Sequence, residues 1–372
     1  MLLRERINIG VLWVISRIVL LGAAAIASWL ALSGGSFGSA YVELWNRWDS
    51  RWFESIAVSG YVGPTVSAFE DFQYNVAFFP GLPGIMWAGE SVGIPATLTG
   101  LIVSFVAGYF AALAVGRLTK FAGGQALWGV LAWVLAPTAV FITAAYTEAL
   151  FAAFAFWAWA YAIQRKWVLA GLLAGIAGIV RPNGLFLAAG LIVLFVLSGT
   201  WKTSHKEWLR GSALLLPLVS AFGYISYLRA ITGDWTTWSA AQGEFWERHL
   251  VDPVTALVNT YNLIFTFSPT GEPSSRMVTE ILAMAIMVAV VVVCAWKRSW
   301  AEVVYVGFTA LSLGTSTMYY SVPRTLVLIF PLWTLLGVFL TRHVWARWAF
   351  VVLSVPALLL VTIRFTQGQW IS

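Results

Sequence analysis

Charged residues and cysteine are both scarce in this sequence. Charged side chains make up 10% of its 372 residues, whereas 60% are hydrophobic and the mean hydropathy is +0.82. A soluble globular domain has roughly 25% charged and about half apolar residues, so the composition excludes that class and predicts a polytopic membrane protein. Cys294, the one cysteine, lies in an apolar run, which excludes a disulfide within the sequence and offers no thiolate metal site.

Long apolar runs predict the helices that cross the membrane. The first run is too long for a secretory signal and has no small-residue cleavage site, so it is expected to be retained. At roughly 20 residues per crossing, the runs predict about eleven helices, at residues 9–32, 94–116, 125–142, 147–163, 167–180, 184–199, 212–231, 278–296, 301–318, 325–341 and 347–364. The two short runs beside Arg181 and Pro182 are interpreted as one broken helix or as a hairpin of shallow helices.

The basic residues indicate how the chain is oriented. Those in short loops on one side of the predicted membrane are Arg4, Arg6, Arg117, Lys120, Arg165, Lys166, Lys202, Lys206, Arg210, Lys297, Arg298, Arg342 and Arg347. The positive-inside rule makes this side cytoplasmic, so the net charge of +6 indicates topology and not nucleic-acid binding. We therefore predict one integral domain, residues 1–372, with two inserts, 33–93 and 232–277, on the outer face.

The first insert concentrates charge in a chain that otherwise has little. Arg47, Asp49, Arg51 and Glu54 lie within eight consecutive positions. Asp49 is the one acid among them with no opposite charge three or four residues away, the spacing at which helical ion pairs form. A carboxylate at a membrane surface is a candidate general base, and Asp49 is the candidate in this segment.

Three tryptophans and an isoleucine in the same insert recur at helical spacing, at Trp45, Trp48, Trp52 and Ile56. This pattern predicts an amphipathic helix that lies in the membrane interface with its rings at headgroup level. The alternative is an aromatic belt whose charges are solvated and paired along the helix, such as Arg51 with Glu54. Further on, the run of Pro and Gly at residues 78–84 predicts a bent or re-entrant segment.

Two other charged positions need separate accounts. Arg17 lies inside the first apolar helix, where an unpaired charge is expensive, so we expect it to pair with another helix or to hold a lipid phosphate. Glu70 and Asp71 are adjacent carboxylates, but neighbouring side chains diverge and no further ligand stands at metal-binding spacing. A solvated loop is the favoured interpretation, and no metal site is expected.

Six sequence elements together resemble the PIG-V family, the GPI mannosyltransferase 2 type of multi-spanning glycosyltransferase. They are WNRWDSRWFESIAVSGY, NVAFFPGLPG, AAYTEALFA, GIVRPNGLFL, GDWTTWSAAQGEFWERHLVDP and SVPRTLVLIFPLW. They follow the family's order and span residues 45–333. Two positions depart from its pattern: Pro182 stands where a small residue is expected, and Thr325 stands where an aromatic residue is common. The excess of arginine over lysine fits a bacterial member.

The resemblance implies an all-α polytopic fold of the GT-C type, with the active site on the extracytoplasmic face of the cell membrane. It implies inverting transfer of mannose from a polyprenyl-phosphate-mannose donor to a lipid or glycolipid acceptor, with Asp49 as the general base. Membrane lipids are the other expected partners; no cofactor, metal or nucleic acid is implied. The substrate-binding residues it implies are Trp45, Trp48, Arg51, Tyr61, Tyr146, Glu148, Arg181, Asn183, Gln242, Trp246, Arg248 and Arg324.

The residues themselves leave alternatives open. Arg181, Arg248 and Arg324 suit a departing phosphate because guanidinium groups fit phosphate oxygens, but each can also snorkel to lipid headgroups or pair with an acid. Glu148 either favours a helix N-terminus electrostatically or binds a sugar hydroxyl or an arginine. A transporter or flippase would spread charges through the helices near the midplane, where only Arg17 lies. A non-catalytic assembly subunit remains a third hypothesis.

Overall fold

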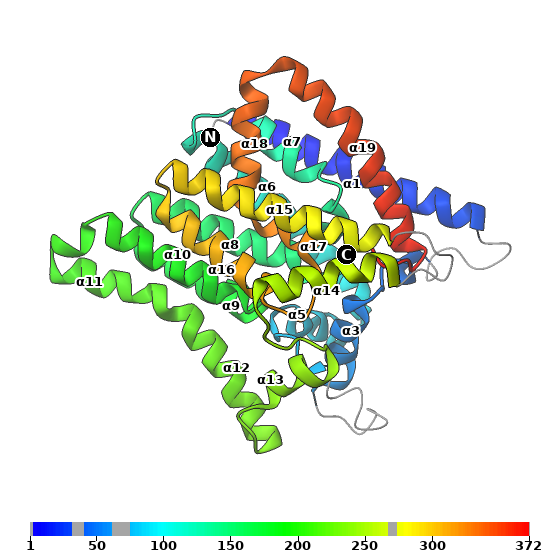
Figure 1. Cartoon of the computed structure of the whole chain (residues 1–372), viewed down its shortest axis with the longest axis horizontal. Coiled ribbons are helices and arrows are strands. Elements are labelled where there is room, and N and C mark those ends of the chain that lie inside the picture. The colour runs from blue at the N-terminus through cyan, green and yellow to red at the C-terminus, as the bar shows by residue number, and fades with distance from the viewer. Residues whose placement is uncertain (1–2, 32–40, 62–74, 267–273, 372) are drawn as a thin grey trace. The chain divides into compact units, whose positions relative to one another are not determined.

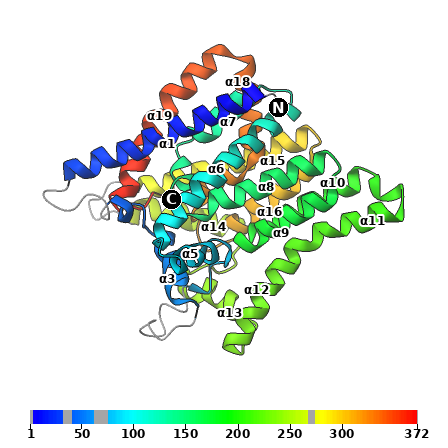
Figure 2. The same cartoon turned by 180° about the vertical axis from the view of Figure 1, so that it is seen from behind.

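The computed structural model of the chain describes residues 3–31, 41–61, 75–266 and 274–371 (Figures 1 and 2). Within these ranges it consists of helices and no strand, apart from one isolated bridge between Leu250 and Ser316. The all-α polytopic fold class is therefore confirmed. Glu70 and Asp71 lie outside the described residues, as do all other residues of the first insert between 33 and 40 and between 62 and 74.

Five of the described helices are long and apolar enough to cross a membrane. They are α1 (Leu3–Ala31), α6 (Ala96–Phe121), α11 with α12 (His205–Ser212 and Leu216–Thr232), α15 (Ser275–Trp296) and α19 (Val344–Thr366). A sixth is possible if the bent pair α17 (Val322–Thr325) and α18 (Phe330–Arg342) forms one span. Shorter apolar helices are α8 (Thr147–Ile163), α9 (Trp167–Val180), α10 (Asn183–Leu197) and α16 (Trp300–Gly314). The count of eleven crossings stays a prediction.

Two predicted helices are interrupted. The helix expected at 125–142 stops as α7 (Ala126–Val134) and resumes only as the short turn η1 (Ala139–Ile142). Pro137 lies in this gap, and proline disfavours helix at the residue before it while lacking its own N–H. The helix expected at 325–341 is bent by 71° before α18. The break at Arg181-Pro182 occurs where the sequence predicted one.

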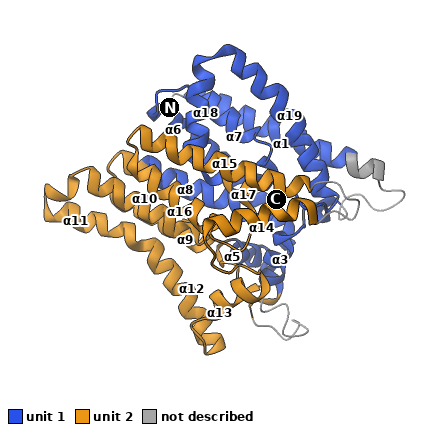
Figure 3. Ribbon diagram, in the orientation of Figure 1, with its two compact units in different colours: residues 1–58, 82–160, 327–371 blue, residues 59–81, 161–326, 372 orange. Residues whose placement is uncertain are grey.

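The chain divides into two compact units, which Figure 3 colours separately. Unit 1 contains residues 1–58, 82–160 and 327–371, and therefore α1, α3 (Asp49–Ser59), α6, α7, α8, α18 and α19. Its helices α6 and α18 both pack against α7 (Figures 1 and 2). A Cβ on Gly337 of α18 would lie 2.5 Å from the Cα of Gly129 of α7, so glycine alone allows this approach.

Unit 2 contains residues 59–81 and 161–326 with the terminal Ser372, and it is built on the hairpin of α9 and α10. Helix α12 packs on α9, and α16 packs on α10. A Cβ on Gly184 would lie 2.4 Å from the Cα of Gly178, so the two arms of the hairpin meet through glycine just beyond Arg181. The unit also holds α13 (Thr237–Ala240), the π-helical turn η4 (Ala241–Phe245), α14 (Pro253–Thr266), α15 and α17.

Candidate active site

Asp49 is the first residue of α3 and is buried, with 6% of its surface exposed. The residue before it, Trp48, adopts a left-handed backbone conformation with φ of 55°. The predicted continuous helix through the tryptophans is therefore wrong, since α3 begins only after Trp48. A carboxylate in a first helical turn lies where the helix dipole stabilises negative charge.

The chain just before Asp49 is held from two other parts of unit 1. The Tyr146 hydroxyl donates a 3.0 Å hydrogen bond to the Arg47 carbonyl, and the Arg47 guanidinium donates to the Thr366 carbonyl at 3.2 Å. Trp45 is fully buried in an apolar cluster that includes Tyr146. The Trp48 ring meets the Trp370 ring edge-on, with centroids 4.4 Å apart. The backbone turn that presents Asp49 is thus anchored by residues far away in the sequence.

Glu54 and Arg51 have structural partners of their own. Glu54 accepts hydrogen bonds from the Asn46 amide and from the Thr97 hydroxyl, the latter at 3.0 Å. Arg51 is exposed and donates from Nε to the Asn46 carbonyl at 3.2 Å. Glu54 therefore ties α3 to α6, and no local pattern indicates Thr97 because that contact is long-range.

Tyr146, Thr147 and Glu148 lie where α8 begins, and Glu148 is fully buried there. The Ser104 hydroxyl donates to the Ala144 carbonyl at 2.7 Å, which fixes the turn before the helix. The Tyr146 ring meets the Phe53 ring of α3 edge-on at 6.3 Å. Unit 1 therefore brings two of the predicted motifs together, the one that contains Asp49 and the one that contains Glu148.

Arg17 is fully buried in α1, and its donors are directed at the break between α7 and η1. Its guanidinium donates to the Val134 carbonyl at 2.9 Å, to the Ala139 carbonyl at 3.3 Å and to the Thr143 hydroxyl. It also lies over the Trp13 ring, 4.5 Å from the centroid. Of the two predicted roles for Arg17, these contacts favour pairing with another helix over holding a lipid phosphate.

In unit 2, the residues around Phe78 form a second cluster of candidates. The hydroxyls of Tyr61 and Tyr224 both donate to the Phe78 carbonyl, at 2.7 and 2.8 Å. The Trp246 ring packs edge-on against the Phe78 ring at 5.5 Å. Burial raises the pKa of Tyr61, so its phenol stays protonated and acts as a donor. Two predicted residues, Tyr61 and Trp246, thus meet on one backbone segment.

The segment that follows Phe78 packs against Val180, the residue before Arg181. A Cβ on Gly81 would lie 2.8 Å from the Cα of Val180, the last residue of α9, so the chain from Phe78 packs against the end of this helix. Arg181 follows in an extended conformation, and Asn183 begins α10. Both side chains are half-buried. The helix break therefore places the Arg181 guanidinium and the Asn183 amide just after the close contact between Gly81 and Val180.

Arg248 and Arg276 share one aromatic ring. Their guanidinium carbons lie 5.6 and 4.9 Å from the centroid of the Tyr320 ring. The Arg248 amide donates to the Gln242 carbonyl at 2.9 Å, which ties it to the π-helical turn η4. Arg276 was not among the predicted site residues, because it follows residues 267–273 at the start of an apolar run with no motif around it.

Arg324 is buried in the short helix α17, and a fully buried carboxylate holds the start of that helix. Glu280 of α15 accepts hydrogen bonds from the backbone N–H groups of Ser321 and Val322, at 2.9 and 2.8 Å. The sequence analysis missed Glu280. An acid within an apolar helix was the signal that would have found it, since such residues are expensive in a membrane.

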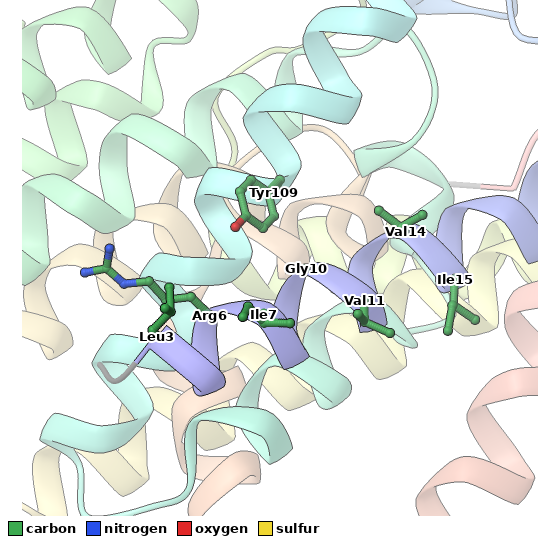
Figure 4. Close-up of a pocket in the computed structure, with 8 residues that line it drawn as sticks. All are labelled: Leu3, Arg6, Ile7, Gly10, Val11, Val14, Ile15 and Tyr109. Atoms are coloured by element: carbon green, nitrogen blue, oxygen red, sulfur yellow. The ribbon is translucent and has the colours of Figure 1, made fainter.

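Described residues of unit 1 also form a surface hollow. It follows one flank of α1 and is lined by Leu3, Arg6, Ile7, Gly10, Val11, Val14, Ile15 and Tyr109 (Figure 4). None of the predicted site residues lines it, and most of its lining is apolar. It takes no part in the candidate site.

Comparison with known proteins connects these elements to one family. The family model described as Mannosyltransferase (PIG-V) matches residues 35–225. GPI alpha-1,6-mannosyltransferase 2 of Rattus norvegicus is 31% identical over 209 residues, which are 49% of this chain and 40% of that protein. The protein of the same name in Homo sapiens is 32% identical over 154 residues, covering 38% and 29%. GPI mannosyltransferase 2 of Schizosaccharomyces pombe is 28% identical over 148 residues, covering 38% and 30%. The matched part thus spans less than half the length of these relatives.

Proposed function

Because the chain belongs to the PIG-V mannosyltransferase family, we propose that it transfers a mannosyl residue from a polyprenyl-phosphate-mannose donor to a lipid or glycolipid acceptor. Asp49 acts as the general base on the extracytoplasmic face. The observation that carries this proposal is the placement of Asp49 in unit 1. It is buried at the start of α3, and Tyr146 holds the turn before it while leading into Glu148.

The chemistry needs a base and a stabilised leaving group. The acceptor hydroxyl attacks the anomeric carbon of mannose, its proton passes to the Asp49 carboxylate, and the bond to the lipid phosphate breaks with its electron pair going to the phosphate. A single displacement inverts the anomeric configuration. A positioned base contributes about 10²–10⁴-fold, and preorganised cations supply much of the remaining stabilisation.

The arginines of unit 2 are proposed to stabilise the leaving phosphate. Arg181 stands at the break of the α9–α10 hairpin, and Arg324 is buried in α17. Their planar guanidinium groups match phosphate oxygens, which a lysine ammonium does not. In the topology predicted from the positive-inside rule, these helix ends and Asp49 are expected on the outer side of the membrane. The lipid tail of such a donor requires a membrane, in keeping with the apolar helices.

The transporter hypothesis is weakened by the surroundings of Arg17. A transport pathway would place ionisable groups along a route through the helices. Arg17 instead donates hydrogen bonds to two carbonyls and a hydroxyl of its own unit. These contacts satisfy backbone groups at the break between α7 and η1. The charge inside the first apolar helix therefore has a structural role that needs no transport pathway.

The test is turnover by the purified protein with synthetic polyprenyl-phosphate sugars and a panel of acceptor lipids. Asp49→Asn keeps the size of the side chain and removes its basicity, so turnover should fall about 10²-fold or more while donor binding survives. Glu43→Gln is the matched control, since Glu43 is an exposed acid in the same segment. Wild-type turnover by Asp49→Asn would remove Asp49 from the reaction. Transfer of glucose or arabinose in preference to mannose would show that the donor sugar is not mannose.

A further inference from the structure

A buried carboxylate in unit 2 accepts two hydrogen bonds from the segment that carries Arg324. Glu280 has no exposed surface and lies in the second turn of α15. Each of its two carboxylate oxygens accepts one backbone N–H: Oε1 from Ser321 at 2.9 Å and Oε2 from Val322 at 2.8 Å. These contacts join residues 41 and 42 positions apart and fix α15 to α17.

The segment that Glu280 holds is conformationally demanding. Ser321 adopts a left-handed backbone conformation with φ of 64°, which residues other than glycine seldom adopt. The short helix α17 then runs from Val322 to Thr325 with Pro323 at its start. A strained backbone position persists only where its surroundings over-determine it. The two hydrogen bonds that Glu280 accepts from this segment provide such a constraint.

From these contacts we propose that Glu280 is a positioning residue that sets the direction of Arg324 by holding the amides of Ser321 and Val322 where α17 begins. The inference rests on the proposed function in one respect, that Arg324 contacts the phosphate of the lipid donor. Glu280 itself touches no substrate. Burying a carboxylate is expensive unless its oxygens are satisfied, and here the backbone of the Arg324 segment satisfies both.

A second role for Glu280 must be separated from this one. Arg276 lies one turn earlier on α15, and both Arg276 and Arg248 are close enough to interact electrostatically with Glu280. If neutralising these arginines were its main role, Glu280 would act through Arg276 and Arg248 and not through the Ser321 and Val322 amides. A double-mutant cycle distinguishes the two, because residues that act through one another give non-additive effects.

The experiment measures binding of farnesyl phosphate, a prenyl phosphate without sugar, to the purified full chain. Arg324→Ala should weaken binding by roughly 10- to 100-fold, as expected for loss of a hydrogen bond to a charged group. Glu280→Gln should weaken it by about tenfold or more, because one amide then faces an NH₂ donor instead of an oxygen. The double variant of Glu280→Gln with Arg324→Ala should bind at most about twofold more weakly than Arg324→Ala alone. When Glu280→Gln is combined with Arg276→Ala instead, the two losses of binding free energy should add.

Controls separate positioning from a general loss of structure. Glu302→Gln makes the same change on α16, where the acid is half-buried, and should leave binding unchanged. Each variant is checked by gel filtration and thermal unfolding, and Glu280→Asp, which keeps the charge and shortens the clamp by one methylene, replaces Glu280→Gln if the latter does not fold.

Three results would overturn the proposal: wild-type binding by Glu280→Gln, additive losses with Arg324→Ala, or no binding by the wild-type chain. Failure of the proposed function looks different. In that case the binding cycle gives the expected pattern, but the wild-type chain transfers no sugar from any polyprenyl-phosphate donor. The clamp by Glu280 would then stand as part of a lipid-phosphate site with another use.

Discussion

Replacing Arg17 tests whether the buried guanidinium stabilises the α7–η1 break or only adds a desolvation cost. Arg17→Met keeps a long side chain of similar reach and removes every donor. The Val134 carbonyl then loses its bond to the guanidinium. The Ala139 carbonyl is less affected, because the Thr143 hydroxyl also donates to it at 3.0 Å. The Val134 carbonyl is strongly affected, whereas the Ala139 carbonyl and the Thr143 hydroxyl keep the hydrogen bond between them. The expected loss in the free energy of unfolding is therefore about 1–3 kcal/mol.

The measurement is thermal unfolding of the purified protein in detergent, followed by intrinsic tryptophan fluorescence. A loss of this size corresponds to a decrease in Tm of roughly 1–4 °C for a chain of 372 residues. Arg17→Lys should recover only part of it, since a single ammonium lacks the planar guanidinium fork that reaches carbonyls in different directions. Arg4→Gln, at an exposed position of the same helix, is the control.

An unchanged or raised Tm in Arg17→Met would refute this reasoning. It would mean that the cost of burying the charge exceeds the value of its hydrogen bonds, as happens for some buried ionic groups. The carbonyls at the break would then have to be satisfied by a rearrangement of η1. In that case Arg17 would need a role other than stabilisation.

Three further predictions follow from the candidate site. Tyr146→Phe removes the hydroxyl that anchors the turn before Asp49, so kcat should fall several-fold with little change in donor KM, and an equal fall in affinity would contradict a positioning role. Arg181→Ala should lose about 2–4 kcal/mol of transition-state stabilisation in kcat/KM assays, and Arg181→Lys should recover little; normal kinetics in both would move the phosphate elsewhere. A cysteine introduced at exposed Ser239 should react with an impermeant reagent from outside intact cells, whereas one at exposed Ser204 should not, and the reverse labelling would end the outer-face mechanism.

Local patterns predicted those parts of the site that depend on chain geometry nearby. The Arg181-Pro182 break was predictable because proline lacks an N–H and disfavours helix before it. The same rule holds at Pro137, where the helix expected at 125–142 is interrupted between α7 and η1. The regular spacing of the tryptophans suggested one helix, yet the left-handed conformation of Trp48 ends that pattern before Asp49. Spacing alone does not reveal where a helix begins.

What the sequence by itself determined is the class of the protein and the identity of its motifs. A chain with so few charges must satisfy its backbone within helices, because lipid offers no hydrogen bonds. Its ordered motifs also identified the family, which the matched residues 35–225 confirm. Tertiary structure alone decided which distant backbone groups the buried charges contact. Arg17 reaches a carbonyl 117 residues away and Glu280 clamps amides 41 and 42 residues away. Such contacts depend on where the folded backbone leaves unsatisfied donors and acceptors, and no local period in the sequence records them.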